Sequence, residues 1–257
     1  MATWNAFNCC AEYPFDAERA RQCWGQLHAG DQEPLPHDGR VLEAWALFHC
    51  GEFQRAAELG EQAGLAGVTV TSNATCIYAN YLEPREKVRL RLFLDTADRA
   101  AALAASEPDN ANAFYWLAYA LGRYSQGISV AKALAQGVGG KVKSALERTI
   151  ALQPRHADAH VALGAFHAEV IDKVGSLIAN MTYGARKETS LHLFEKALGL
   201  TPLSVIAKIE YANALVILEG DKRLTDATRY YEQAAGTRAL DAAERLDVEM
   251  ALAELAS

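Results

Sequence analysis

The feature that most constrains the fold of this chain is a pattern of small residues and prolines that recurs along it. The prolines that share the pattern are Pro108, Pro154 and Pro202. A small residue, Thr149 or Ala197, stands five positions before the second and third prolines, whereas Leu103 holds that position before the first. After each proline comes a large residue followed by a small one, at Leu117–Ala118, Leu163–Gly164 and Tyr211–Ala212. This recurrence predicts helical hairpins that stack on one another, because one hairpin cannot bury its apolar face alone.

The pattern resembles the tetratricopeptide repeat (TPR), in which a small residue on the first helix lets the second helix approach and a proline ends the unit. Its phase predicts a single domain over residues 1–257 with about five hairpins, which begin near residues 37, 71, 111, 157 and 205. We expect an opening helix at about 16–28 and a closing helix at about 241–255, with Asp241 as its N-cap. The predicted fold class is all-α, a right-handed α-solenoid of TPR-like hairpins with capping helices. The alternatives are a helical bundle and another kind of α-solenoid.

Two units are longer than the regular repeat of about 34 residues. The three prolines are 46 and 48 residues apart, and the excess falls between the helices of each hairpin, at 126–140 and 172–185. Both inserts carry apolar residues at helical spacing, which include Ile128 and Leu134 in the first and Leu177, Ile178 and Met181 in the second. Two interpretations stay open. The inserts extend the first helices and pack against each other, or they line an apolar groove or pocket for a peptide or a lipophilic ligand.

The region from Tyr115 to Pro202 has two long units, with Lys143–Arg148 after the first insert and Leu193–Ala197 after the second. In this it resembles the regulator-of-microtubule-dynamics family and is similar to the T-component of TRAP transporters, a periplasmic repeat protein. The resemblance implies a role in binding a protein or shuttling a ligand, without catalysis. Unlike the T-component, the sequence shows no export signal. Unlike the regulator-of-microtubule-dynamics family, it shows no membrane segment.

The inner face of such a solenoid is built from the first helices of the hairpins. The residues at its repeat positions include Asn112, Tyr115, Tyr119, Arg123, Asp158, Glu169 and Asn213. The two tyrosines and the arginine are typical of interaction hot spots, and ordinary packing between helices is the alternative. A clamp for a terminal carboxylate is not expected, because Val161 and Ala165 stand where such a clamp needs polar groups.

Neither metal binding nor catalysis is predicted. His156, His160 and His167 have a spacing compatible with zinc, but two of them fall on packing positions of the repeat. The chain has no GxSxG, P-loop, GxGxxG or HExxH motif. An enzyme with an unrecognised site is a third hypothesis, and it would need a cleft with strongly perturbed titratable groups. We expect no cofactor.

Charge and composition narrow the partners. The net charge is −7 with acids and bases intermixed, so nucleic acid is not expected. No apolar run approaches 18 residues, and the N-terminus lacks the features of a signal peptide, which predicts a cytoplasmic protein without a membrane span. The five cysteines are expected to be reduced, packed thiols.

These observations predict a scaffold that binds another protein or peptide segment on its concave face. The alternative is a carrier of a small lipophilic molecule, held in a pocket that the inserts form. An exposed insert would also allow the chain to form a homo-oligomer.

Overall fold

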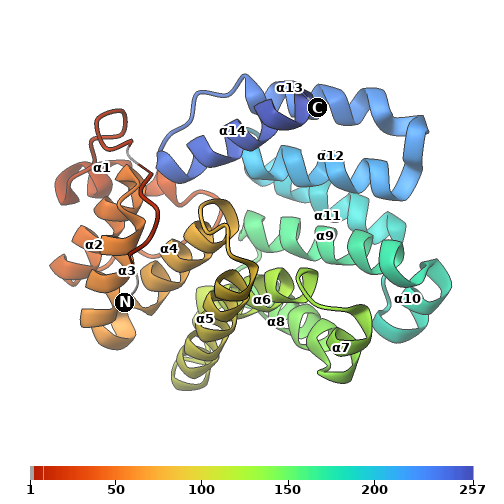
Figure 1. Cartoon of the computed structure of the whole chain (residues 1–257), viewed down its shortest axis with the longest axis horizontal. Helices are drawn as coiled ribbons and strands as arrows, with labels where there is room; N and C mark the ends of the chain where they lie inside the picture. Colours follow the sequence, from red (N-terminus) through yellow and green to blue (C-terminus); the bar gives the residue numbers. More distant parts are fainter. Residues whose placement is uncertain (1–2, 8, 257) are drawn as a thin grey trace. The chain divides into compact units, whose positions relative to one another are not determined.

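The structure, a computed structural model, describes residues 3–7 and 9–256. These residues form α-helices, short 3-10 helices, turns and loops, and none of them lies in a β-strand (Figure 1). The chain divides into two compact units. The first comprises the residues up to His28, Gln32–Leu152 and Leu240–Ala243, and the second comprises Ala29–Asp31, Gln153–Ala239 and the residues from Glu244 onward. The predicted all-α class is confirmed, and each unit is built from TPR-like helical hairpins.

The first unit contains an opening helix and three hairpins. Its helices are α1 (Ala17–Leu27), α2 (Gly39–Cys50), α3 (Phe53–Gln62), α4 (Val68–Tyr81), α5 (Glu86–Ser106), α6 (Ala111–Gln126), α7 (Val130–Ala135) and α8 (Val138–Leu152), with a 3-10 helix at Gly64–Gly67. Helices α2 and α3, α4 and α5, and α6 and α8 pack as pairs. Side chains cap several of these helices. The Asp16 carboxylate, for example, accepts a hydrogen bond from the backbone N–H of Arg19 at 2.8 Å and so fixes the start of α1.

The second unit contains two hairpins and most of the closing helix. Its helices are α9 (Ala157–Val174), α10 (Ser176–Tyr183), α11 (Lys187–Leu200), α12 (Val205–Glu219) and α13 (Leu224–Ala235), with a 3-10 helix at Gly220–Arg223. Helix α14 (Ala242–Leu255) starts in the first unit. Its later residues Val248 and Ala251 pack with Val205, Ile209 and Ala234 of α12 and α13.

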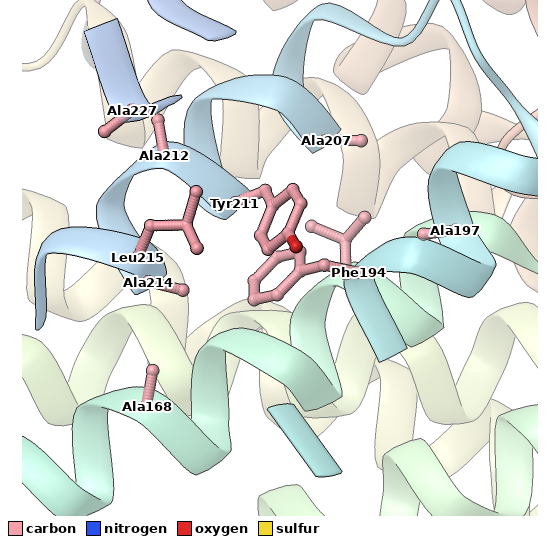
Figure 2. Packing of buried hydrophobic residues seen from close by; sticks show 10 residues of the cluster. Ala168, Phe194, Ala197, Ala207, Tyr211, Ala212, Ala214, Leu215 and Ala227 are labelled. Carbon is pink, nitrogen blue, oxygen red and sulfur yellow. The ribbon is translucent and has the colours of Figure 1, made fainter. Parts of the chain in front are cut away.

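Small residues let these helices approach one another closely. Figure 2 shows the core of the second unit, where alanines surround a few large side chains. The rings of Phe194 on α11 and Tyr211 on α12 stack there with centroids 5.2 Å apart. Phe194 and Leu215 are fully buried in the same cluster. The small and large residues that alternate in the sequence are thus the residues that pack the helices of the hairpins together.

Beyond Gln126 and Val174 the inserts do not continue the first helices, so the interpretation that they extend these helices is wrong. Helix α6 ends at Gln126, and α7 follows as a separate short helix. Helix α9 reaches only Val174, and Gly175 with a φ of 80° turns the chain into α10. A left-handed glycine costs little there, whereas a helix cannot continue through it.

The expectation of five reduced thiols is wrong for two cysteines. Cys10 and Cys50 form a disulfide that joins the N-terminal segment to the end of α2, with Cα atoms 4.5 Å apart. Cys9, Cys23 and Cys76 belong to no disulfide. Burial raises the pKa of the Cys76 thiol to about 12, so this residue is an inert part of the core. Among residues 3–7 and 9–256, no helix combines the length and the apolar character needed to cross a bilayer.

Candidate partner-binding surfaces

Asn112 lies at the start of α6, where its side chain is buried. Its Nδ2 donates a hydrogen bond to Oε2 of Glu33 at 2.5 Å. The preceding residue Asn110 caps the same helix by accepting from the backbone N–H of Ala113. Asn112 therefore ties α6 to the loop that carries Glu33, which is a structural use of a predicted binding residue.

The next turns of α6 carry an aromatic cluster that ends in a cation. Tyr115 is buried against Trp116, with ring centroids 5.0 Å apart. Tyr119 is half-buried, and its ring lies 5.4 Å from that of Trp116. The guanidinium carbon of Arg123 lies 5.3 Å from the centroid of the Tyr119 ring. The cation–π contact restrains both side chains. Tyr119 and Arg123 are half-buried, whereas Tyr115 is buried.

Asp158 lies at the start of α9, and Glu169 lies in the C-terminal half of this helix. The backbone N–H of Asp158 donates to the carbonyl of Gly30 at 3.2 Å. Burial raises the pKa of the Asp158 carboxyl to about 7, and the negative charge of Asp31 adds to the shift. Glu169 is half-buried. Asp158 therefore belongs to the packed start of α9.

The neighbouring His156 is the N-cap of α9. Its Nδ1 accepts a hydrogen bond from the backbone N–H of Ala159 at 3.1 Å. Burial lowers the pKa of His156 to about 4, so the imidazole is neutral at neutral pH. An imidazole that accepts at Nδ1 and is fully buried serves the helix start.

The other two histidines of the predicted metal-compatible set also serve the fold. Nε2 of His160 lies 3.0 Å from the carbonyl oxygen of Pro154. Nδ1 of His167 accepts from the backbone N–H of Arg186 at 3.2 Å. Within the described part of the chain, no three metal-binding side chains gather into a group that could hold an ion.

Asn213 is exposed on α12, and its Oδ1 accepts a hydrogen bond from the Tyr231 hydroxyl on α13 at 2.5 Å. Burial raises the pKa of Tyr231 to about 12. The amide therefore joins the two helices of the last hairpin while it faces solvent.

Several apolar side chains of the inserts are exposed to solvent. Ile128, which precedes α7, is half-buried, and Leu134 on α7 is exposed. On α10, Leu177, Ile178 and Met181 are 73%, 56% and 80% exposed. Helix α10 is attached to the unit by other residues: Ala179 is buried, and the Tyr183 ring meets Phe166 edge-on with centroids 5.8 Å apart. The structure thus brings Leu177, Ile178 and Met181 together as one exposed stripe, which we call the α10 surface.

One aromatic contact in the first unit was not predicted from the sequence. Trp4 of the N-terminal segment stacks on Tyr78 of α4, with ring centroids 4.2 Å apart. The signal in the sequence was two aromatic residues, Trp4 and Phe7, in a segment without helical periodicity. Periodicity assigns helices, and it says nothing about where an irregular segment binds.

Comparison with known proteins identifies a family. Residues 67–255 match the family model described as "Regulator of microtubule dynamics protein 1-3", which confirms the resemblance seen in the sequence. No curated protein matches the chain significantly.

Solved structures support the repeat fold. A thermophilic TPR protein from Thermus thermophilus has a TM-score of 0.57 and 16% identity, over 83% of this chain and 97% of that one. YrrB, described as a TPR protein with an unusual peptide-binding site, has a TM-score of 0.42 and 12% identity, over 93% and 98% of the two chains. MamA has a TM-score of 0.39 and 17% identity, over 74% and 85%. The first of these comparisons shows the TPR-like fold.

Proposed function

The chain belongs to the regulator of microtubule dynamics protein 1-3 family, and from this premise we propose that it is a non-enzymatic adaptor that holds another protein. The observation that carries the proposal is the α10 surface, where Leu177, Ile178 and Met181 are mostly exposed. Contiguous exposed apolar side chains on a soluble domain mark sites of association.

The chemistry of α10 indicates what kind of partner it holds. The helix Ser176–Tyr183 contains no charged residue. An uncharged apolar stripe gains affinity by removing its own surface from water, about 25 cal/mol per Å² of apolar area. The matching partner is an apolar segment of another protein, such as one face of an amphipathic helix.

A carrier of a small lipophilic molecule is the second candidate. Its supporting observation is the same set of apolar insert residues. A closed carrier pocket would remove these side chains from solvent, whereas Leu177 and Met181 are mostly exposed on the helix. The exposure therefore favours an adaptor.

An enzyme is the third candidate, and its supporting observation is Asp158, whose pKa near 7 would suit a general acid or base. Its neighbour His156 is 0% exposed and accepts a hydrogen bond from the helix it caps. Burial of this kind explains the perturbed groups as parts of the helix start, without a substrate.

Site-specific photo-crosslinking tests the adaptor proposal. A photoreactive amino acid replaces Thr182, an exposed residue on α10, in the full chain expressed in cells. We expect one cross-linked protein species that disappears in a Leu177→Ser/Met181→Ser variant. The matched control is Leu203→Ser/Leu224→Ser, which removes two other exposed leucines and should leave the cross-link unchanged.

Native mass spectrometry of the same preparation separates the alternatives. A defined small mass that is lost on denaturation, together with no cross-linked protein, would contradict the adaptor and favour the carrier. A cross-linked species with twice the mass of the chain would identify self-association instead.

A further inference from the structure

The N-terminal segment Thr3–Phe7 contacts α3, the second helix of the first hairpin, and α4, the first helix of the second hairpin. It has no regular secondary structure, and its trace runs beside α3 and α4 in Figure 1. It has none of the helical hairpin pattern, yet it is held by specific contacts. We call Gln54, Tyr78 and Leu82, which make these contacts, the α3–α4 platform.

The platform binds the backbone of the segment. The N–H of Trp4 donates to Oε1 of Gln54 at 2.8 Å, and the N–H of Asn5 donates to the Tyr78 hydroxyl at 3.4 Å. The Asn5 amide returns a hydrogen bond to the carbonyl of Leu82 at 2.8 Å. Hydrogen bonds to backbone N–H groups tolerate many sequences, which is how extended peptides are commonly held.

Ring faces supply the specificity. The Trp4 indole lies parallel to the Tyr78 ring, at an interplanar angle of 11°. Three residues on, the Phe7 ring lies 6.5 Å from that of Phe53 on α3, also nearly parallel. Tyr78 is only 1% exposed with the indole in place, so departure of the segment would uncover a flat aromatic surface. Stacked ring pairs stabilise a contact beyond the burial of apolar area alone.

The platform is held in shape by residues outside the segment. The Tyr78 hydroxyl donates to Oε2 of Glu83 at 2.9 Å. Arg85 donates to both oxygens of Glu83, at 2.8 and 2.9 Å. Nε2 of Gln54 donates to Glu58, which leaves Oε1 oriented toward the segment. A site fixed in this way loses little conformational entropy when a ligand arrives.

The segment is also tethered. The Cys10–Cys50 disulfide ties it to the end of α2, and the Cys9 thiol donates to the carbonyl of Cys50 at 3.4 Å. A tethered ligand this close is present at roughly millimolar effective concentration, so it excludes weak competitors.

We propose that the α3–α4 platform is a recognition site for an extended segment of a partner protein that carries two aromatic residues three positions apart. The chain's own Thr3–Phe7 occupies the platform while the Cys10–Cys50 disulfide is closed. A few local contacts hold the segment, so it opens more readily than the hairpins do. This site is separate from the α10 surface and does not depend on it.

Reduction of the disulfide is the step that loosens the tether. A dithiol attacks one sulfur, the mixed disulfide closes on itself, and the reagent leaves as its cyclic disulfide. The reagent loses two electrons and two protons, and the sulfurs of Cys10 and Cys50 gain them as two thiols. The backbone is then the covalent link that remains between the N-terminal segment and the helices, and its hydrogen bonds and ring contacts alone hold it on the platform.

Fluorescence anisotropy with a synthetic peptide tests the proposal. The probe is a labelled peptide with the sequence of residues 3–13, in which serine replaces both cysteines. The receptor is the full chain with Trp4→Ala/Cys10→Ser, which weakens the internal segment and removes its tether. We expect binding at least tenfold tighter than to the oxidised wild-type chain, and loss of binding when alanine replaces the tryptophan of the peptide.

Platform variants make the test specific. Adding Gln54→Ala removes the acceptor for the first backbone N–H and should weaken the peptide about fivefold to tenfold. Adding Gln62→Ala, an exposed glutamine on the same helix, should change nothing. The dithiothreitol-reduced wild-type chain is a second preparation without any substitution, and it should bind the peptide more tightly than its oxidised form.

Three results would overturn the proposal. One is a released or reduced chain that keeps its helical circular dichroism and binds the peptide no better than the oxidised wild type. Another is an equal loss of affinity with Gln54→Ala and Gln62→Ala. The third is a dimer of the Cys10→Ser chain that requires Trp4, which would assign the platform to the N-terminal segment of a second copy. The Leu177→Ser/Met181→Ser variant should bind the peptide normally, so failure of the α10 surface is distinguishable from failure of this one.

Discussion

A methyl group added to Gly164 on α9 would lie 2.9 Å from Cε2 of Phe194 on α11. The two helices of this hairpin therefore meet at a distance that only glycine permits. The Ser190 hydroxyl donates to the carbonyl of Gly164 at 2.7 Å and secures the same contact. The small residue of the repeat and the aromatic three positions before Ala197 are thus two halves of one packing interaction.

Replacing Gly164 with alanine should destabilise the chain. Phe194 is fully buried and stacks on Tyr211, so the added methyl displaces a ring that has no room to move. We expect a loss of about 1–3 kcal/mol in the free energy of unfolding, measured by urea denaturation. The control is Gly199→Ala on α11, where a new Cβ meets no atom within 4 Å. It should stabilise the helix by up to about 1 kcal/mol, and a similar loss in both variants would contradict the packing argument.

The helices of the repeats could be predicted because their signals are local. The small–large pairs and the prolines place hairpins near residues 111, 157 and 205, and α6, α9 and α12 begin at Ala111, Ala157 and Val205. The division of the chain into one domain or several stays a prediction. The separate helix α10 was not foreseen, because it depends on the left-handed conformation of Gly175, which a glycine permits and does not dictate.

The sequence predicts on which helices the candidate residues lie, but not which groups surround them. The repeat phase places Asn112 and Asp158 on first helices, but the groups that interact with them, Glu33 and Asp31, lie outside the repeat. The Cys10–Cys50 disulfide joins residues 40 positions apart. Pairing across that separation follows from tertiary structure, since spacing alone does not define connectivity.

Glu83 should make the chain sensitive to acid. Hydrogen bonds from Arg85, aided by one from Tyr78, lower the pKa of Glu83 from 4.5 to about 2. A carboxyl group with a depressed pKa stabilises the fold above the unfolded value, and this contribution is lost as the pH falls from about 4.5 to 2. Glu83→Gln should cost about 1–3 kcal/mol at pH 7 and less at pH 2.5. Denaturation at both values measures the difference. Glu86→Gln, an exposed neighbour, should match the wild type, and a penalty for Glu83→Gln that does not depend on pH would refute the assignment.

His156 and Asp158 should have opposite effects on the pH dependence of stability. Burial lowers the pKa of His156 from 6.5 to about 4, so its contribution is lost as the pH falls through this range. Burial and the charge of Asp31 raise the pKa of Asp158 from 3.8 to about 7, so its contribution is lost as the pH rises. Asp31 acts electrostatically on both groups, and His160 acts on His156. In the wild type the two contributions change the free energy of unfolding in opposite directions between pH 4 and 7, so they nearly cancel.

Single substitutions should reveal how each group makes the free energy of unfolding depend on pH. Asp158→Asn leaves only His156, so the free energy of unfolding should fall by about 3 kcal/mol between pH 7 and pH 4 relative to the wild type. His156→Gln should show the reverse trend, with stability lost toward pH 7. Urea denaturation at pH 4, 5.5 and 7 measures both. Parallel curves for Asp158→Asn and the wild type would mean that the two groups do not titrate as described.

The α10 surface should contribute to binding and not to folding. Leu177 and Met181 are mostly in solvent, so Leu177→Ser/Met181→Ser should change the free energy of unfolding by less than about 0.5 kcal/mol. Leu215→Ala removes a fully buried side chain from the core in Figure 2 and should cost about 2–5 kcal/mol. Urea denaturation of both variants provides the comparison. A loss above about 2 kcal/mol for the double variant would mean that these side chains pack within the chain, and the adaptor proposal would then lose the exposed surface on which it depends. A stable variant that no longer cross-links its partner would separate binding from folding.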